Sequence, residues 1–162
     1  MDWASALLQA ILTVIIGVTV YALGQVAVKF FIEPLDKLSE TIGEVLDTLV
    51  YYSNIYTNPV IEHEPIEMTT LRKDAEKTLR QKATLLLSKA SRVRLYGFAS
   101  FFRVIPPKKN IIEAHKELIF LSNSCFSGNP EGTFKSAEKI KILLTSRKAP
   151  PSIPDKLRVP YK

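Results

Sequence analysis

A short segment in the middle of the chain, residues 92–103 with the sequence RVRLYGFASFFR, interleaves arginines with aromatic side chains. An arginine can form two parallel hydrogen bonds with a phosphate, and an aromatic face can stack on a base at about 1–3 kcal/mol. These residue types in this order predict a surface that binds an anionic ligand such as a nucleotide. The candidate ligand-binding residues are Arg92, Arg94, Tyr96, Arg103, Lys108 and Lys109.

The charge of the chain is unevenly distributed, and this distribution has three interpretations. Residues 1–71 carry two basic and nine acidic side chains, a net charge of −7, whereas residues 72–109 carry eleven basic and two acidic ones, a net charge of +9. An acidic helix and a basic helix could pack together and satisfy each other. The basic helix could instead be attracted to anionic lipid headgroups, at about 1 kcal/mol per Lys or Arg near the surface. The third interpretation is a pocket for a multiply charged ligand, such as a nucleotide or an oligonucleotide.

Residues that could carry catalysis or bind a metal are few. The histidines are His63 and His115, and Cys125 is the single cysteine. His63 lies between Glu62 and Glu64, but three adjacent residues cannot all face one ion on a regular backbone. No phosphate-binding loop, nucleophile elbow, Cys/His metal spacing or dinucleotide-binding turn is present in the sequence. We therefore expect a protein that is not an enzyme and needs no cofactor or metal. We expect His115 to be a packed or surface residue rather than a base, and Cys125 to have a small buried apolar role.

The N-terminal region predicts a membrane anchor over residues 1–33. From Trp3 to Val28 the chain has twenty-six consecutive uncharged residues, more than the roughly 20 apolar residues that cross a bilayer core. The run is too long, and its start too poor in basic residues, for a cleaved signal peptide. All 22 basic residues follow this run, which favours a single-pass protein of the bacterial inner membrane with its C-terminal domain in the cytoplasm. The single cysteine excludes an intrachain disulfide, in agreement with that compartment.

Small residues recur every seven positions in the anchor, at Ala10, Gly17 and Gly24. Such a stripe lets two helix backbones approach closely, so it predicts self-association of the anchor. The alternative is that Gly and Ala are simply common in membrane helices.

Residues 34–146 predict a small helical bundle, and the fold class is all-α. Pro34 either kinks one long helix or starts a new one. The helix after Pro34 presents one apolar face, made of Leu35, Leu38, Ile42, Leu46, Leu49 and Val50. A second helix is expected over residues 70–93, with Leu71, Ala75, Leu79, Leu86 and Ala90 inward. Its expected outward face is basic and holds Arg72, Lys73, Lys77, Arg80, Lys82 and Lys89.

Two further helices complete the expected bundle. One starts at Asn110, because Asn with Glu113 three residues later is a signal similar to a capping box. A short last helix over residues 134–144 buries Phe134, Ala137, Ile140 and Leu144. Residues 147–162 are rich in proline and predict a flexible extended tail.

Several longer stretches resemble a known group of proteins. They are FIEPLDKLSETIGEVLDTLVYYSNIYTNP, with Gly43 and Glu44 in mid-helix, LRKDAEKTLRQKA, ELIFLSNSCFSGN and AEKIKILL. Together they resemble an uncharacterised family of small bacterial membrane-anchored helical proteins. The layout is also similar to that of membrane effectors of bacterial antiviral (CRISPR-type) defence, whose cytosolic domain senses a cyclic oligonucleotide. The resemblance implies no catalytic residue.

The expected function is that of a non-catalytic, membrane-anchored interaction or regulatory protein that self-associates through its anchor. The alternative is a ligand-gated membrane effector whose basic domain binds an anionic nucleotide. The expected partners are the lipid bilayer, further copies of this chain and, in the alternative, the nucleotide. The sequence does not identify a protein partner.

Overall fold

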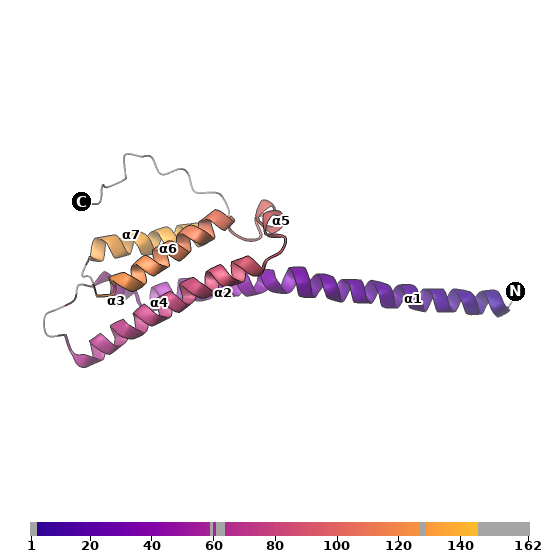
Figure 1. The fold of residues 1–162 in the computed structure, drawn as a ribbon, viewed down its shortest axis with the longest axis horizontal. Helices are drawn as coiled ribbons and strands as arrows, with labels where there is room; N and C mark the ends of the chain where they lie inside the picture. The colour runs from indigo at the N-terminus through magenta and orange to yellow at the C-terminus, as the bar shows by residue number, and fades with distance from the viewer. Residues whose placement is uncertain (1–2, 59, 61–63, 127–128, 146–162) are drawn as a thin grey trace.

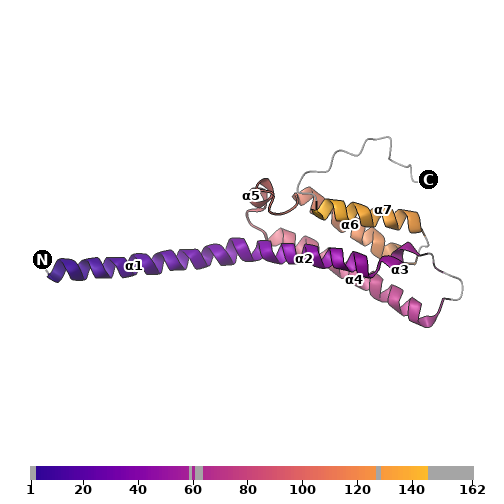
Figure 2. The same ribbon diagram turned by 180° about the vertical axis from the view of Figure 1, so that it is seen from behind.

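A computed structural model describes residues 3–58, 60, 64–126 and 129–145 of the chain. The predicted all-α class is confirmed, because these residues form helices and no strand. Figures 1 and 2 show a long rod, formed by α1, that projects from one end of a compact bundle. The expected tail over residues 147–162 lies outside the described residues, and so do Glu62 and His63.

The long helix begins with α1 (Trp3–Ala27) and continues through a π-helical turn, η1 (Val28–Ile32), into α2 (Glu33–Tyr51). Together they form one uninterrupted helix of 49 residues from Trp3 to Tyr51. None of the 25 residues of α1 is buried, and at 1.5 Å per residue α1 is about 38 Å long. Within the described residues, this is the one helix long and apolar enough to cross a membrane.

The π-helical turn accounts for the way in which Pro34 is accommodated in the long helix. A proline has no amide N–H to donate, and its ring clashes with the carbonyl four residues earlier. Just before Pro34, the N–H of Glu33 donates to the carbonyl of Val28, five residues back. This wider turn absorbs the misfit, so the helix continues past Pro34 instead of ending there.

Four main helices form the bundle. α4 (Ile66–Arg92) lies in the middle and packs against both α2 and α6 (Lys108–Ser124), and α6 packs against α7 (Pro130–Thr145). The short α3 (Ser53–Thr57) contacts α7 and α4. The core consists of apolar side chains at helical spacing and includes Leu38, Val45, Leu49, Ala75, Leu79, Leu86, Ala90, Leu118, Ala137, Ile140 and Leu144.

Several expected core or cap positions are wrong. Val50 and Phe134 are well exposed and Leu71 lies at the surface, because these side chains lie on faces of α2, α7 and α4 that the neighbouring helices do not cover. The third helix of the bundle, α6, starts at Lys108 with Pro107 as its N-cap, and no side chain caps it. Asn110 is instead fully buried and donates its side-chain amide to the carbonyl of Leu143 at 3.1 Å. It therefore ties α6 to α7.

Candidate functional site

The arginine and aromatic segment lies at the end of the bundle from which α1 projects (Figures 1 and 2). It connects α4 to α6 and contains the short helix α5 (Tyr96–Phe101). Tyr96 and Ala99 hold the segment to the bundle, because both are buried. The Tyr96 hydroxyl donates to the carbonyl of Pro106 at 2.7 Å, and burial raises the pKa of this phenol to about 12.

A turn after α5 fixes the direction of the segment. Arg103 has a φ of 58°, in the left-handed region. The N–H of Val104 donates to the carbonyl of Ala99 at 2.9 Å, and the N–H of Arg103 donates to that of Ser100 at 3.0 Å. This pair of hydrogen bonds is the Schellman motif that ends many helices, usually with glycine at the left-handed position. Here an arginine occupies it, and its side chain is exposed.

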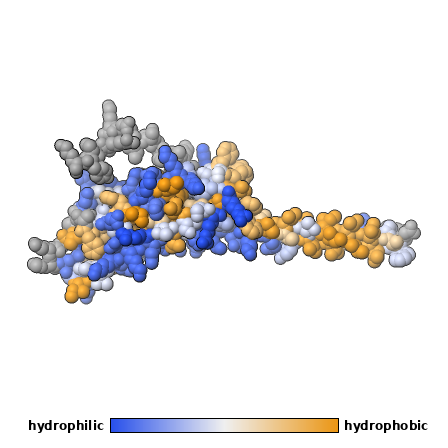
Figure 3. Space-filling model, in the orientation of Figure 1, coloured by the Kyte–Doolittle hydropathy of each residue, from blue (hydrophilic) through white to orange (hydrophobic). Residues whose placement is uncertain are grey.

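The phenylalanines of this segment face away from the core. Phe98, Phe101 and Phe102 are exposed, and Phe101 is 80% accessible. Their rings contact one another, with centroids 4.7 Å apart for Phe98 and Phe102 and 5.4 Å apart for Phe101 and Phe102. With exposed Leu95 and Val104 they form what we call the α5 patch, residues Leu95, Phe98, Phe101, Phe102 and Val104. Figure 3 shows an apolar prominence at this junction, beside the apolar rod.

The predicted binding residues lie between the last residue of α4 and the first two residues of α6, at this end of the bundle. Arg92, Arg94, Arg103, Lys108 and Lys109 are all exposed. The Arg94 guanidinium carbon lies 4.8 Å from the centre of the Phe30 ring in η1, so this segment contacts the long helix where its uncharged run ends. Tyr96 differs from the others, because its buried ring does not present a free face to a ligand. The binding role predicted for the exposed residues stays a prediction.

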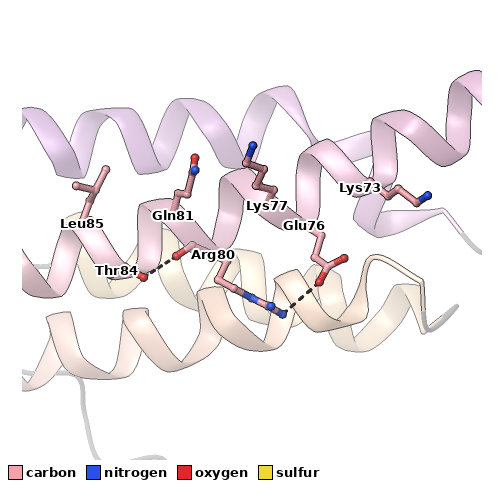
Figure 4. Close-up of a pocket in the computed structure, with 7 residues that line it drawn as sticks. All are labelled: Lys73, Glu76, Lys77, Arg80, Gln81, Thr84 and Leu85. Atoms are coloured by element: carbon pink, nitrogen blue, oxygen red, sulfur yellow. Dashed lines mark hydrogen bonds and ion pairs between the residues drawn. The ribbon is translucent and has the colours of Figure 1, made fainter.

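The predicted pairing of acidic and basic helices is met by one ion pair between α2 and α4 in the described part of the chain. Lys82 Nζ lies 2.9 Å from Glu44 Oε2. Seven residues of α4 line a shallow groove of about 610 Å³. Figure 4 shows them along one side of α4: Lys73, Glu76, Lys77, Arg80, Gln81, Thr84 and Leu85.

This groove has a net positive charge. The Arg80 guanidinium is engaged, because its Nη2 lies 3.2 Å from Glu76 Oε1 and donates to Asn123 Oδ1 at 2.7 Å. Lys73 and Lys77 are exposed and have no ion-pair partner within the described residues. The groove therefore offers two ammonium groups to an anion, at a place apart from the α5 segment.

Arg72 has a different role from the one that its charge predicts. It was expected on the outer face of α4, but it is 1% exposed. Its Nε lies 2.9 Å from both carboxylate oxygens of Glu64, and its Nη2 lies 2.8 Å from Glu64 Oε1. Its Nη1 donates to the carbonyl of Ile55 in α3 at 2.7 Å and to that of Cys125, the C-cap of α6, at 3.0 Å.

One cation thus neutralises a carboxylate and satisfies carbonyls at two helix C-termini, which otherwise have no helical partner. The sequence does contain a signal for this position. Arg72 precedes Ala75 by three residues and Leu79 by seven, so helical spacing places it on the buried stripe of α4.

The other titratable residues noted in the sequence have packing roles. His115 is half-buried, and its Nδ1 lies 3.0 Å from the carbonyl of Ala83. Cys125 is buried, and desolvation raises the pKa of its thiol to about 11, so the thiol is protonated at neutral pH. A thiol in that state is a poor nucleophile. No group of three or more His, Cys, Asp or Glu side chains that could hold a metal occurs among the described residues.

No family model, curated protein or solved structure matches this chain.

Proposed function

We propose that this chain is a non-catalytic, single-pass membrane-anchored interaction protein. Residues 1–33 form the anchor in the bacterial inner membrane, and the bundle of residues 34–146 stands on the cytoplasmic side. The uninterrupted helix from Trp3 to Tyr51 carries this proposal. Its first part exposes only uncharged side chains, and its second part supplies core residues of the bundle.

This continuity supports an interaction role rather than that of a passive tether. A flexible linker would let the bundle reorient independently of its anchor. Here Leu38, Val45 and Leu49 of the same helix are fully buried in the bundle. Binding of a partner to the bundle therefore acts directly on the tilt or rotation of the anchor, and a change in the anchor acts on the bundle.

The residues best suited to catalysis support the absence of an enzymatic role. The Cys125 thiol is buried with a pKa of about 11, and it donates a hydrogen bond to the carbonyl of Leu121 at 3.4 Å. Neither this thiol nor the half-buried His115 has the exposed, activated geometry of a nucleophile or a general base.

Self-association through Ala10, Gly17 and Gly24 is part of the proposal. A Cβ added at Gly17 or Gly24 has no atom within 4 Å outside the backbone of its own helix and its two chain neighbours. A larger side chain at either position therefore leaves the monomer intact and changes only what another helix can approach. Small residues at such positions allow close backbone contact between membrane helices.

The test is energy transfer between donor- and acceptor-labelled full-length chains in proteoliposomes. We expect G17L/G24L to weaken self-association by about 1–2 kcal/mol, which is roughly a tenfold weaker dimer, because close contacts between the helices are lost. Val18→Leu is the matched control, since it enlarges a lipid-accessible neighbour and should leave the signal unchanged. A wild-type signal no greater than that of randomly mixed, non-interacting chains would refute self-association.

The α4 groove supports a second candidate, the ligand-gated membrane effector that binds an anionic nucleotide. Lys73, Lys77 and Arg80 place three cations around one depression, with Glu76 as the single carboxylate. In this candidate, bound phosphate groups would bridge the two free ammonium groups. The signal would reach the anchor because α4 packs on α2.

Thermal denaturation of the full-length chain in mild detergent, with linear and cyclic nucleotides, tests this candidate. A ligand at about 100 times its Kd adds about 2.7 kcal/mol, which raises Tm by several degrees. Loss of that rise in K73E/K77E but not in R92E/R94E assigns the ligand to the groove, and the reverse assigns it to the α5 segment. A flat response to the whole panel at low salt would exclude nucleotide binding and leave the interaction protein.

A further inference from the structure

We propose that the α5 patch is a second membrane contact, inserted into the headgroup region of an anionic bilayer beside the point where the long helix leaves it. The occupant of this apolar surface is thus the lipid surface itself. The inference rests on the proposed anchor and goes beyond it, because it holds the bundle against the membrane in one orientation.

The α5 patch lies beside the turn at which the uncharged run of the long helix ends. Arg94 stacks on Phe30 at 4.8 Å and so fixes the α4–α5 connection to η1. Lys29, the first charged residue after the uncharged run, lies in the same turn. A helix whose uncharged part is embedded up to this turn therefore has its membrane interface at the level of η1. Figures 1 and 2 show α5 at the side of the long helix, at the end of the bundle from which α1 projects.

The α5 patch combines exposed aromatic rings with arginines, as segments that lie in a membrane interface do. The Phe102 ring packs against those of Phe98 and Phe101, all three rings are exposed and point away from the core, and Phe101 is 80% accessible. Segments that lie in a membrane interface combine such bulky apolar side chains with Lys and Arg around them. Here the exposed Arg92, Arg94 and Arg103 flank the rings. Arginine pairs with lipid phosphate through two hydrogen bonds, so the rings enter the lipid while the guanidinium groups bind headgroups.

The fold presents the patch in one direction. Tyr96 and Ala99 are the buried side of α5, and the left-handed turn at Arg103 closes the helix. The side of α5 opposite to Tyr96 and Ala99, which carries Phe98 and Phe101, therefore faces away from the bundle. An interfacial segment that is already folded in this way loses little conformational freedom when it inserts.

Variants that carry a single tryptophan at different positions test the inference in proteoliposomes. Trp3 is the only tryptophan, so the background is the full-length W3F variant. F101W reports on the patch, and F134W is the matched control, because Phe134 is 56% exposed on the first turns of α7, at the end of the bundle far from α1. V14W reports on the proposed span. The lipids are phosphatidylcholine with or without phosphatidylglycerol, and they carry a spin-label quencher at a shallow or a deep acyl position.

We expect V14W to be quenched best by the deep label, F101W best by the shallow label, and F134W hardly at all. Quenching of F101W should increase with phosphatidylglycerol, and R92E/R94E should weaken it severalfold in those vesicles. High salt should act in the same direction, because exposed charges are screened.

Each other outcome is informative. V14W quenched while F101W matches F134W would overturn the docking of the patch and leave the anchor, so the patch would then face another protein. F101W and F134W quenched alike would also overturn it, because the bundle would lie on the membrane without a specific face. If V14W is not quenched, the anchor proposal fails, and only continued shallow quenching of F101W would preserve the docking of α5.

Discussion

Replacing Arg72 by methionine is expected to destabilise the bundle by about 3–5 kcal/mol, because it removes one partner of a buried ion pair. Glu64 would lose its counterion, with its side chain only 9% exposed. The carbonyls of Ile55 and Cys125, to which Nη1 donates at 2.7 Å and 3.0 Å, would lose the same donor. Since domains have only about 5–15 kcal/mol of stability in total, this loss is large. Urea denaturation of the full-length chain in mild detergent, followed by near-ultraviolet circular dichroism, measures it.

Two variants make the result specific to Arg72. Lys73→Met removes a cation from the adjacent, exposed position and should cost less than about 0.5 kcal/mol. R72K keeps the charge but cannot reproduce the two-pronged contact with Glu64, so it should fall between R72M and the wild type. If R72M were as stable as Lys73→Met, the guanidinium would not be the link between α3, α4 and α6.

The double variant V14R/V18R is expected to release the protein from membranes. Both valines are exposed near the middle of α1, one helical turn apart. A single arginine at the centre of a membrane helix costs about 2.5–3.5 kcal/mol on insertion scales, so two cost about 5–7 kcal/mol. Alkaline extraction of membranes from expressing cells measures the effect, since it removes peripheral proteins and leaves spanning ones.

The control is a variant with the same two charges at a different position on the long helix. Val50→Arg/Tyr51→Arg puts the same two charges on exposed residues at the other end of the long helix, where we expect no change in extraction. Retention of V14R/V18R at the wild-type level would mean that α1 does not span the bilayer. The bundle would then be held by another contact, and the proposed function would have to be revised.

The helical character of the chain follows from local properties of its sequence. The uncharged run from Trp3 to Val28 and the periodic apolar positions Ala75, Leu79, Leu86 and Ala90 are local properties of the chain, and the structure agrees with both. The packing roles of His115 and Cys125 also follow from their apolar neighbours. The continuity of the helix past Pro34 was open, because a proline can be absorbed by a π-helical turn or can start a new helix.

Which surfaces are free and which charges are buried depends on contacts between distant parts of the chain. Spacing shows which residues share a helix face, but not how far a neighbouring helix covers that face, so Val50 and Phe134 were wrongly assigned to the core. The charge of Arg72 indicated solvent, because a charge is costly to bury without partners. Its partners come from residues 8 positions before it, in Glu64, and 53 positions after it, in Cys125. Only the folded chain brings such distant groups together, and by the same means it places the α5 patch beside the long helix.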